Sequence, residues 1–400
     1  MHAFSEKSIL NYRAIVMLAI GETIVWACLF YIFPALLLRW EGAFLWTKLQ
    51  LTGAITLALL VSALFSPMFG KLIDRGYGPG LLACGALAGG ICLYLVTFVT
   101  ELWQFYIVWS LIGCCFAACL YEPCFSLLTR VYSKEAKQAI ILVTLVAGFA
   151  SAISFPAAHL IASQWGWQSV VRSFSVATVF IGAPLLLLGA NLVEGEYKSP
   201  VQSVTRGGDP DKFTYLCNPK FIRLAVAFAA LAIVHGATLH HLLPILSDRG
   251  MLLSISVFIA SLIGPMQVLG RIVITVLQNQ LSHRLILYCA FICMSSAMIL
   301  LFVSHVGITF AVLFAVVFGS GYGTLSIIRP VIARDILGDE NFGAKSGLLA
   351  FFYLIGAAAS PFTGSLIWLV GGYDAVIIVL FGLALAGLLL IHSAIRADSN

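Results

Sequence analysis

Residues 80–100, GLLACGALAGGICLYLVTFVT, form an apolar run that contains no charged side chain. An α-helix needs about 20 such residues to cross the roughly 30 Å hydrocarbon core of a bilayer, and this run is long enough. Apolar residues make up 61% of the 400-residue chain and charged residues only 10%, against roughly a quarter charged in a soluble domain. Lipid must therefore solvate most of the apolar surface, which predicts a polytopic membrane protein.

Similar runs follow one another along the whole chain, and most breaks between them contain Gly, Pro or a charged residue. The first ten residues are polar and mixed, so we expect no cleavable signal peptide. The pattern predicts an all-α membrane protein with twelve transmembrane helices, over residues 13–38, 48–70, 80–100, 103–129, 138–161, 169–191, 221–245, 252–277, 284–304, 307–333, 345–368 and 374–395.

The distribution of positive charge predicts the topology. Of the 22 lysine and arginine residues, most fall on one face of this twelve-helix arrangement, and Arg271 falls inside a predicted helix. The other face receives only Arg39, Lys48, Arg172 and Arg249. Because cytoplasmic loops are enriched in Lys and Arg, we expect a multi-pass protein of the cytoplasmic (inner) membrane with both termini inside.

The longest polar stretch separates the predicted helices into two sets of six. It contains GEYKSP and TRGGDPDK, which are typical of a flexible linker. We therefore expect an N-terminal six-helix bundle over 1–191, a cytoplasmic linker over 192–219 and a C-terminal bundle over 220–400. Pro156 and Pro361, and Gly166 and Gly372, recur at nearly the same separation. Such a duplicated unit, with the solute site between its halves, is common in transporters.

Residues 70–75, GKLIDR, resemble the G-x-L-x-D-R-x-G-R-R signature between helices 2 and 3 of the major facilitator superfamily, although the final basic pair is absent. The resemblance implies a secondary transporter in which two bundles rock about a central site. It also implies a gating role for Asp74 and Arg75, with Arg130 or Glu135 as partners. A turn with a solvated ion pair is the other interpretation.

Three stretches are similar to the monocarboxylate-transporter-like branch of that superfamily: 264–271 (GPMQVLGR), 334–338 (RDILG) and 372–374 (GYD). In that branch an Asp and an Arg, four residues apart on helix 8, couple the proton and hold the carboxylate. Arg271 matches the Arg, whereas Gln267 stands at the position of the Asp. Since Gln cannot titrate, another residue would have to carry a transported proton.

Two carboxyls lie inside predicted helices, where an ionisable group costs several kcal/mol and usually faces a cavity or a partner. Glu22 is roughly 12 Å into the first helix, at 1.5 Å per residue. It is expected to bind a proton or a cationic solute, and a structural buried acid is the alternative. Glu122 is followed by a proline that can bend its helix. It is expected to bind protons, or else to form a structural ion pair with Arg130 or Arg75.

Two arginines also lie within predicted helices. The planar guanidinium of Arg271 fits a carboxylate in bidentate fashion, so we expect Arg271 to bind the solute; the alternative is that it snorkels to the interface. Arg329 is the counterpart of Glu122 in the second half and is expected to pair with it in the gate, or to be an interfacial anchor. The remaining expected pocket residues are Gln267, Trp26, Tyr31, Tyr322 and His240.

Several function classes are not supported by the sequence. It contains no G-x-x-x-x-G-K-[ST] phosphate loop and no soluble domain, so we expect no ATP-driven pump, no enzyme, no catalytic residue and no cofactor. His235 and His240 point in different directions at 100° per residue, so no metal site is expected. The basic residues form no stripe, which argues against nucleic acid as a partner.

The sequence therefore favours a monomeric secondary transporter in the lipid bilayer, moving a small organic anion, with a monocarboxylate as the leading candidate, together with protons. The alternative is a proton-driven exporter of hydrophobic or cationic compounds, in which Glu22 and the aromatic residues of the first helix would matter more than Arg271. A sensor or lipid-handling protein with a transporter fold is the interpretation from another class.

Overall fold

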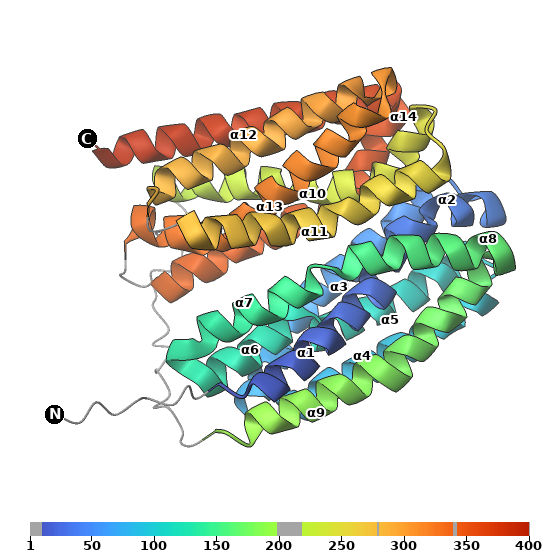
Figure 1. Cartoon of the computed structure of the whole chain (residues 1–400), viewed down its shortest axis with the longest axis horizontal. Coiled ribbons are helices and arrows are strands. Elements are labelled where there is room, and N and C mark those ends of the chain that lie inside the picture. The colour runs from blue at the N-terminus through green and yellow to red at the C-terminus, as the bar shows by residue number, and fades with distance from the viewer. Residues whose placement is uncertain (1–9, 198–217, 278–279, 339–341, 400) are drawn as a thin grey trace. The chain divides into compact units, whose positions relative to one another are not determined.

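The computed structural model describes residues 10–197, 218–277, 280–338 and 342–399 (Figure 1). These residues are helical almost throughout, and no strand occurs among them. The chain divides into two compact units. Unit 1 comprises Met1–Ile32, Leu57–Ala150 and Leu160–Val201, and unit 2 comprises Phe33–Thr56, Ser151–His159 and Gln202–Asn400. The predicted linker over 192–219 lies largely outside the described residues.

Unit 1 is built on α1, which packs against α7 and α9, and on α4, which packs against α5 and α9. Between α1 and α2 the chain makes one π-helical turn at Trp26–Phe30, and such turns occur frequently at functional sites. The helices that contribute to this unit are α1 (Tyr12–Val25), α3 (Lys48–Asp74, from Leu57 onward), α4 (Gly78–Leu95), α5 (Leu102–Cys119), α6 (Tyr121–Tyr132), α7 (Ala136–Ala147), α8 (Ala150–Ala177, mostly) and α9 (Ala183–Glu194).

The helix predicted over 103–129 is interrupted in the structure. Leu120 has extended backbone angles (φ −88°, ψ −163°) and separates α5 from α6. Pro123 has no N–H to donate, so it is tolerated in the first turn of α6 but not in the middle of a continuous helix. The break places Glu122 in the first turn of α6.

Unit 2 is dominated by the packing of α10 on α14, of α11 on α13, and of α12 on both α13 and α14. The start of α3 also belongs to this unit, where Thr52 Oγ1 lies 2.8 Å from Ser365 Oγ. Its helices are α2 (Ile32–Phe44), α10 (Pro219–Asp248), α11 (Leu253–Leu277), α12 (His283–Phe302), α13 (Ile308–Leu337) and α14 (Phe342–Ser399).

Ten helical segments of the described chain are long and apolar enough to cross a membrane. Two of them are much longer than one crossing requires, and each contains a break. The segment Ala136–Glu194 is interrupted at Gly166 (φ +78°), and the segment Lys345–Arg396 at Gly371 and Gly372 (φ +68°). Glycine adopts positive φ without the steric cost that a Cβ brings, so the chain can leave the helix at these two points.

Candidate functional site

Glu22 is the buried acid of unit 1. Its side chain on α1 is 0% exposed, and neither carboxyl oxygen has a hydrogen-bond partner among the described residues. The groups that act on it are the Cys124 thiol, the Glu122 carboxyl and the Trp26 indole. None of these is a cation, so an ionised Glu22 would be a buried charge without a counter-charge, which is strongly unfavourable. These surroundings suit a protonated, neutral Glu22 carboxyl. Its ionised form would be favoured only if a cation bound beside it.

An aromatic cluster lies next to Glu22 along the chain. The Trp26 ring is 4.6 Å from Tyr121 and 6.3 Å from Tyr31, and 4.8 Å from Phe30. Two predicted pocket residues, Trp26 and Tyr31, are therefore brought together, with Tyr121 from the start of α6 as a third member that the sequence did not single out. Aromatic faces of this kind attract cations as well as apolar groups.

The predicted gating residues of unit 1 do not pair as expected. The Arg130 guanidinium binds the Glu194 carboxylate through two hydrogen bonds of 2.8 and 2.7 Å, and it also lies 4.5 Å from the Tyr197 ring. Asp74 and Arg75 are exposed and form no ion pair within the described chain. The expected pairing of Asp74 or Arg75 with Arg130 or Glu135 is not present in the described chain, where Arg130 pairs with Glu194 instead; the gating role of these residues stays a prediction. Glu194 was missed because it lies 64 residues away, at the end of α9.

Arg271 and Gln267 lie on α11 and are almost fully buried, with 7% and 5% of their surface exposed. Arg271 Nε donates to Ser326 Oγ on α13 at 3.2 Å. The two helices are in backbone contact, because a Cβ added to Gly323 would lie only 2.1 Å from the Gln267 carbonyl oxygen. The Gln267 side-chain nitrogen has no hydrogen-bond partner in the described chain. This buried donor lies one helical turn from the buried guanidinium of Arg271.

Tyr322 links the neighbourhood of Arg271 to α10 and α14. The His235 ring of α10 lies flat against it, with ring centroids 3.4 Å apart and planes 7° apart. The Tyr322 hydroxyl is 2.5 Å from the Tyr353 hydroxyl, and the Arg329 guanidinium lies 3.8 Å from the Tyr353 ring. Three predicted residues, Arg271, Tyr322 and Arg329, thus belong to one set of contacts within unit 2.

We call this set the arginine cluster. It is formed by four helices of unit 2, and it adds three residues that were not among the predicted site residues: His235, Ser326 and Tyr353. The sequence excluded His235 only as a metal ligand, because it does not share a helix face with His240. That criterion says nothing about whether His235 contacts α13. The arginine cluster consists of His235, Gln267, Arg271, Tyr322, Ser326, Arg329 and Tyr353.

His240 is buried, with 2% exposed. Its Nδ1 lies 2.8 Å from the Gly236 carbonyl oxygen, one turn earlier in α10, and its ring is 6.2 Å from Phe33. His241 Nε2 lies 2.9 Å from the Pro361 carbonyl oxygen. The rings of His240 and His241 are therefore both anchored to helix backbone. The histidine that belongs to the arginine cluster is His235. In the described chain, no group of three or more His, Cys, Asp or Glu residues is suited to a metal ion.

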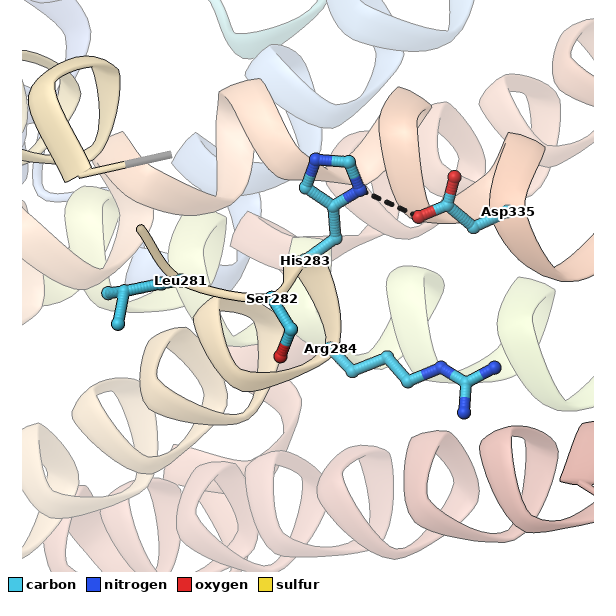
Figure 2. A pocket seen from close by; sticks show the side chains of 5 residues that line it. All are labelled: Leu281, Ser282, His283, Arg284 and Asp335. Carbon is cyan, nitrogen blue, oxygen red and sulfur yellow. Dashed lines mark hydrogen bonds and ion pairs between the residues drawn. The ribbon is translucent and has the colours of Figure 1, made fainter. Parts of the chain in front are cut away.

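A separate surface pocket of about 340 Å³ lies at one end of unit 2. Figure 2 shows it between the start of α12, which supplies Ser282, His283 and Arg284, and Asp335 of α13. His283 Nδ1 lies 2.8 Å from Asp335 Oδ2, and both side chains are about two-fifths exposed (42% and 41%). An exposed pair of this kind contributes little to binding or stability, and the pocket does not include the predicted solute residues.

Comparison with known proteins identifies the family. A family model described as Major Facilitator Superfamily matches residues 17–328. The chain belongs to the major facilitator superfamily. Within it, the chain is 24% identical to monocarboxylate transporter 12 of Xenopus laevis, over 73% of this chain and 69% of the relative. It is 22% identical to monocarboxylate transporter 13 of Rattus norvegicus, over 89% and 82%. This major facilitator is thus similar to proteins named monocarboxylate transporters, and its family indicates a membrane transporter rather than an enzyme.

Solved structures of other major facilitators share the fold. A point mutant of the nucleoside transporter NupG superposes with a TM-score of 0.70 at 15% identity, covering 96% of this chain and 100% of that one. A bacterial homologue of the human lysosomal transporter Spinster, in an inward-facing and occupied conformation, gives 0.63 at 16% identity, covering 98% and 96%. At this level of identity the likeness extends to the fold alone.

Proposed function

We propose that this transporter moves a small organic anion, a monocarboxylate, together with a proton, by alternating access. The observation that carries the proposal is Arg271, a nearly fully buried guanidinium (7% exposed) beside a buried amide donor. A cation within a membrane span is costly and usually marks a solute or ion pathway. Relatives that bear the name monocarboxylate transporter support the same class of solute.

The arginine cluster has the chemistry that a carboxylate needs. The guanidinium offers N–H donors in a planar fork, and charge-assisted hydrogen bonds of this type are about twice as strong as neutral ones. The Gln267 amide nitrogen and the Tyr322 hydroxyl provide further donors on α11 and α13. We propose that Arg271 holds the carboxylate, while Gln267 and Tyr322 set its orientation. Trp26, Tyr31 and His240 are further residues proposed to contact the solute.

We further propose twelve crossings, in bundles over 1–191 and 220–400, with both termini on the cytoplasmic side of the inner membrane and the protein working as a monomer. The breaks at Gly166 and Gly371–Gly372 support this count, because each divides a segment of more than 50 residues where about 20 are enough for one crossing. Glu22 and Glu122 are the proposed proton-binding carboxyls of the first half. Asp74, Arg75, Arg130 and Arg329 are the proposed gating residues.

Solute counterflow in proteoliposomes tests the proposal. Vesicles that contain the pure protein are loaded with unlabelled acetate, pyruvate, L-lactate or benzoate, and the uptake of the same labelled acid is followed against empty liposomes. We expect one acid to be taken up, and Arg271→Gln to lower that uptake by at least about 30-fold, because removing one partner of a buried charge pair costs several kcal/mol.

Arg284→Gln is the matched control, because Arg284 lies at the start of α12 and lines the surface pocket of Figure 2. This variant should transport like the wild type. Equal uptake by Arg271→Gln and Arg284→Gln would refute the role of Arg271. No uptake of any of the four acids by wild-type protein would contradict a small monocarboxylate as the solute.

A second candidate function rests on unit 1. Among the described residues no cation acts on Glu22, and an aromatic cluster lies beside it. This combination suits the export of a lipophilic cation. Proteoliposomes loaded with tetraphenylphosphonium test it. Proton-driven efflux that is lost in Glu22→Gln and retained in Arg271→Gln would favour the exporter over the anion transporter.

A further inference from the structure

Helix α3 begins in unit 2 and continues in unit 1. Residues Phe33–Thr56, which include the first turns of α3, belong to unit 2, whereas α3 from Leu57 onward belongs to unit 1. Along the chain these residues precede the linker, so they are part of the predicted first bundle over 1–191. Within unit 2 they pack with helices that follow the linker. The start of α3 is therefore a place where chain from before the linker is attached to chain from after it.

Two hydrogen-bonded contacts join the start of α3 to α14. Thr52 Oγ1 lies 2.8 Å from Ser365 Oγ, and both side chains are fully buried. One turn further along α3, Thr56 Oγ1 accepts a hydrogen bond of 3.3 Å from the backbone N–H of Phe362. Residues three or four apart share a helix face, so both contacts lie on one face of each helix. The residue number rises on α3 as it falls on α14, so the two helices run antiparallel along this contact.

A cation extends this contact by one more turn. Lys48 Nζ lies 4.5 Å from the centre of the Trp368 ring, and it also pairs with Glu41 Oε1 at 2.7 Å. A cation above an aromatic face is attracted by the ring. Three successive turns of α3 thus meet α14. We call this contact the hydroxyl seam, and it consists of Lys48, Thr52 and Thr56 on α3 and of Phe362, Ser365 and Trp368 on α14.

The polar groups on the α3 side of the hydroxyl seam keep partners of their own when the seam opens. Thr52 Oγ1 also lies 2.9 Å from the Lys48 carbonyl oxygen, one turn earlier in α3, and the Lys48 ammonium retains Glu41. Water can replace the hydrogen bonds made across the seam, so the net loss for each of them is modest. By contrast, α11 and α13 are in backbone contact at Gly323. The hydroxyl seam can therefore open without leaving the Lys48 ammonium unpaired.

We propose that the hydroxyl seam is a gate, which opens when the start of α3 leaves α14 and admits the solute to the arginine cluster. This inference rests on the proposed function, because alternating access requires the solute site to open to one face at a time. In the predicted topology Lys48 lies on the face opposite the cytoplasm, so the gate controls entry and exit on that face. Helix α3 is continuous from Lys48 to Asp74, so a movement of its later turns is transmitted to the seam.

Labelling of a buried position tests whether the seam opens, and it needs no knowledge of the solute. In Ser365→Cys the thiol is buried while the seam is closed, so a charged maleimide outside proteoliposomes reaches it only through the open seam. Because the chain has ten cysteines, peptide mass spectrometry identifies the labelled one. Ser295→Cys is the control, since Ser295 is also buried in unit 2 and its hydroxyl meets the Phe291 carbonyl of its own helix. We expect Ser365→Cys to react at least about tenfold faster, because an open state populated to only a few per cent permits labelling.

A disulfide across the seam tests whether its opening is needed for transport. The hydroxyl oxygens of Thr52 and Ser365 are 2.8 Å apart, so the sulfur atoms of Thr52→Cys/Ser365→Cys need only a small adjustment to form a bond of about 2.05 Å. Copper–phenanthroline in air removes the two thiol hydrogens with their electrons. We expect this treatment to abolish counterflow of L-lactate, or of the acid with the greatest counterflow, and dithiothreitol to restore it. The two single variants, treated alike, should keep their counterflow, which controls for the native cysteines.

The outcomes distinguish this inference from the proposed function. Equal labelling of Ser365→Cys and Ser295→Cys would overturn the gate, even if the double variant does not fold. Full counterflow in the oxidised double variant, with its disulfide detected by mass spectrometry, would also overturn it. If the wild type takes up none of the four acids while Ser365→Cys is labelled rapidly, the gate is supported and the proposed solute is wrong.

Discussion

The two units bury ionisable groups of opposite sign in different settings. In unit 1, Glu22 is 0% exposed, and no cation of the described part of the chain acts on it. In unit 2, Arg271 is 7% exposed and contacts a serine hydroxyl, with a histidine and two tyrosines in the same cluster. A buried acid can become neutral by taking up a proton, whereas a guanidinium stays charged in a protein. The charge of Arg271 therefore persists in every state of the protein, whereas Glu22 can lose its charge.

This difference assigns separate tasks to the two units. In the proposed function, the guanidinium and the donors of the arginine cluster select the charge of the solute. Glu22 can be neutral among its thiol, carboxyl and indole neighbours, and its proposed role is proton handling or cation binding. Variants in each unit therefore test whether the tasks are in fact separate.

After Arg271→Gln, the largest effect is expected from Gly323→Ala in unit 2. The added Cβ would lie 2.1 Å from the Gln267 carbonyl oxygen, and because this is backbone, no rotation of a side chain relieves the clash. Overpacking of this kind costs about 1–3 kcal/mol, and α11 must move away from α13. We expect counterflow to fall at least tenfold. Gly382→Ala, where nothing lies within 4 Å, should have no effect; equal loss in both would exclude local packing as the cause.

Glu22→Gln should affect unit 1 only. The amide has the same shape but cannot ionise, so it removes the cost of a buried acid without leaving a cation unpaired. We expect anion counterflow within about threefold of the wild type and a melting temperature in detergent that is not lower. Glu22→Lys should prevent folding, since it buries a charge among thiols and aromatic rings. A large loss of counterflow in Glu22→Gln would show that the two units share the solute site.

The Arg130–Glu194 fork should contribute a smaller, structural effect. It is a bidentate pair with side chains 14% and 23% exposed, so a double-mutant cycle with Arg130→Ala and Glu194→Ala should report a coupling of about 1 kcal/mol. Asp74→Ala should show no coupling with Arg130→Ala. A coupling of Arg130 to Asp74 that equals its coupling to Glu194 would restore the pairing expected from the family signature.

The smallest effect is expected at the surface pocket of Figure 2. Asp335→Asn removes the charge that faces His283, but both side chains are exposed and screened by salt. We expect less than about 1 kcal/mol of stability to be lost and counterflow to be unchanged. A strong loss of transport without loss of stability would move the functional importance from the arginine cluster to this end of unit 2.

Much of the fold was predictable because hydrophobic length along the chain is a local property. The run 80–100, for example, nearly coincides with the helical segment Gly78–Phe98, which is long and apolar enough to cross a membrane. The break at Leu120 was less predictable. Pro123 indicated a bend, but the extended backbone three residues earlier depends on how α5 and α6 pack against their neighbours.

The candidate site divides in the same way. By itself, the sequence determined that Glu22, Arg271 and Arg329 lie within membrane-spanning helices, because a charged residue in an apolar run is visible without any contact. It also determined the family, through residues 70–75 and 264–271. Only the tertiary structure decided the partners: Glu194 for Arg130, Tyr353 for Tyr322, and the stacking of His235 on Tyr322. Helical periodicity tells which residues share a face, but the neighbour that a face meets depends on the rotation and packing of whole helices, and these are long-range properties.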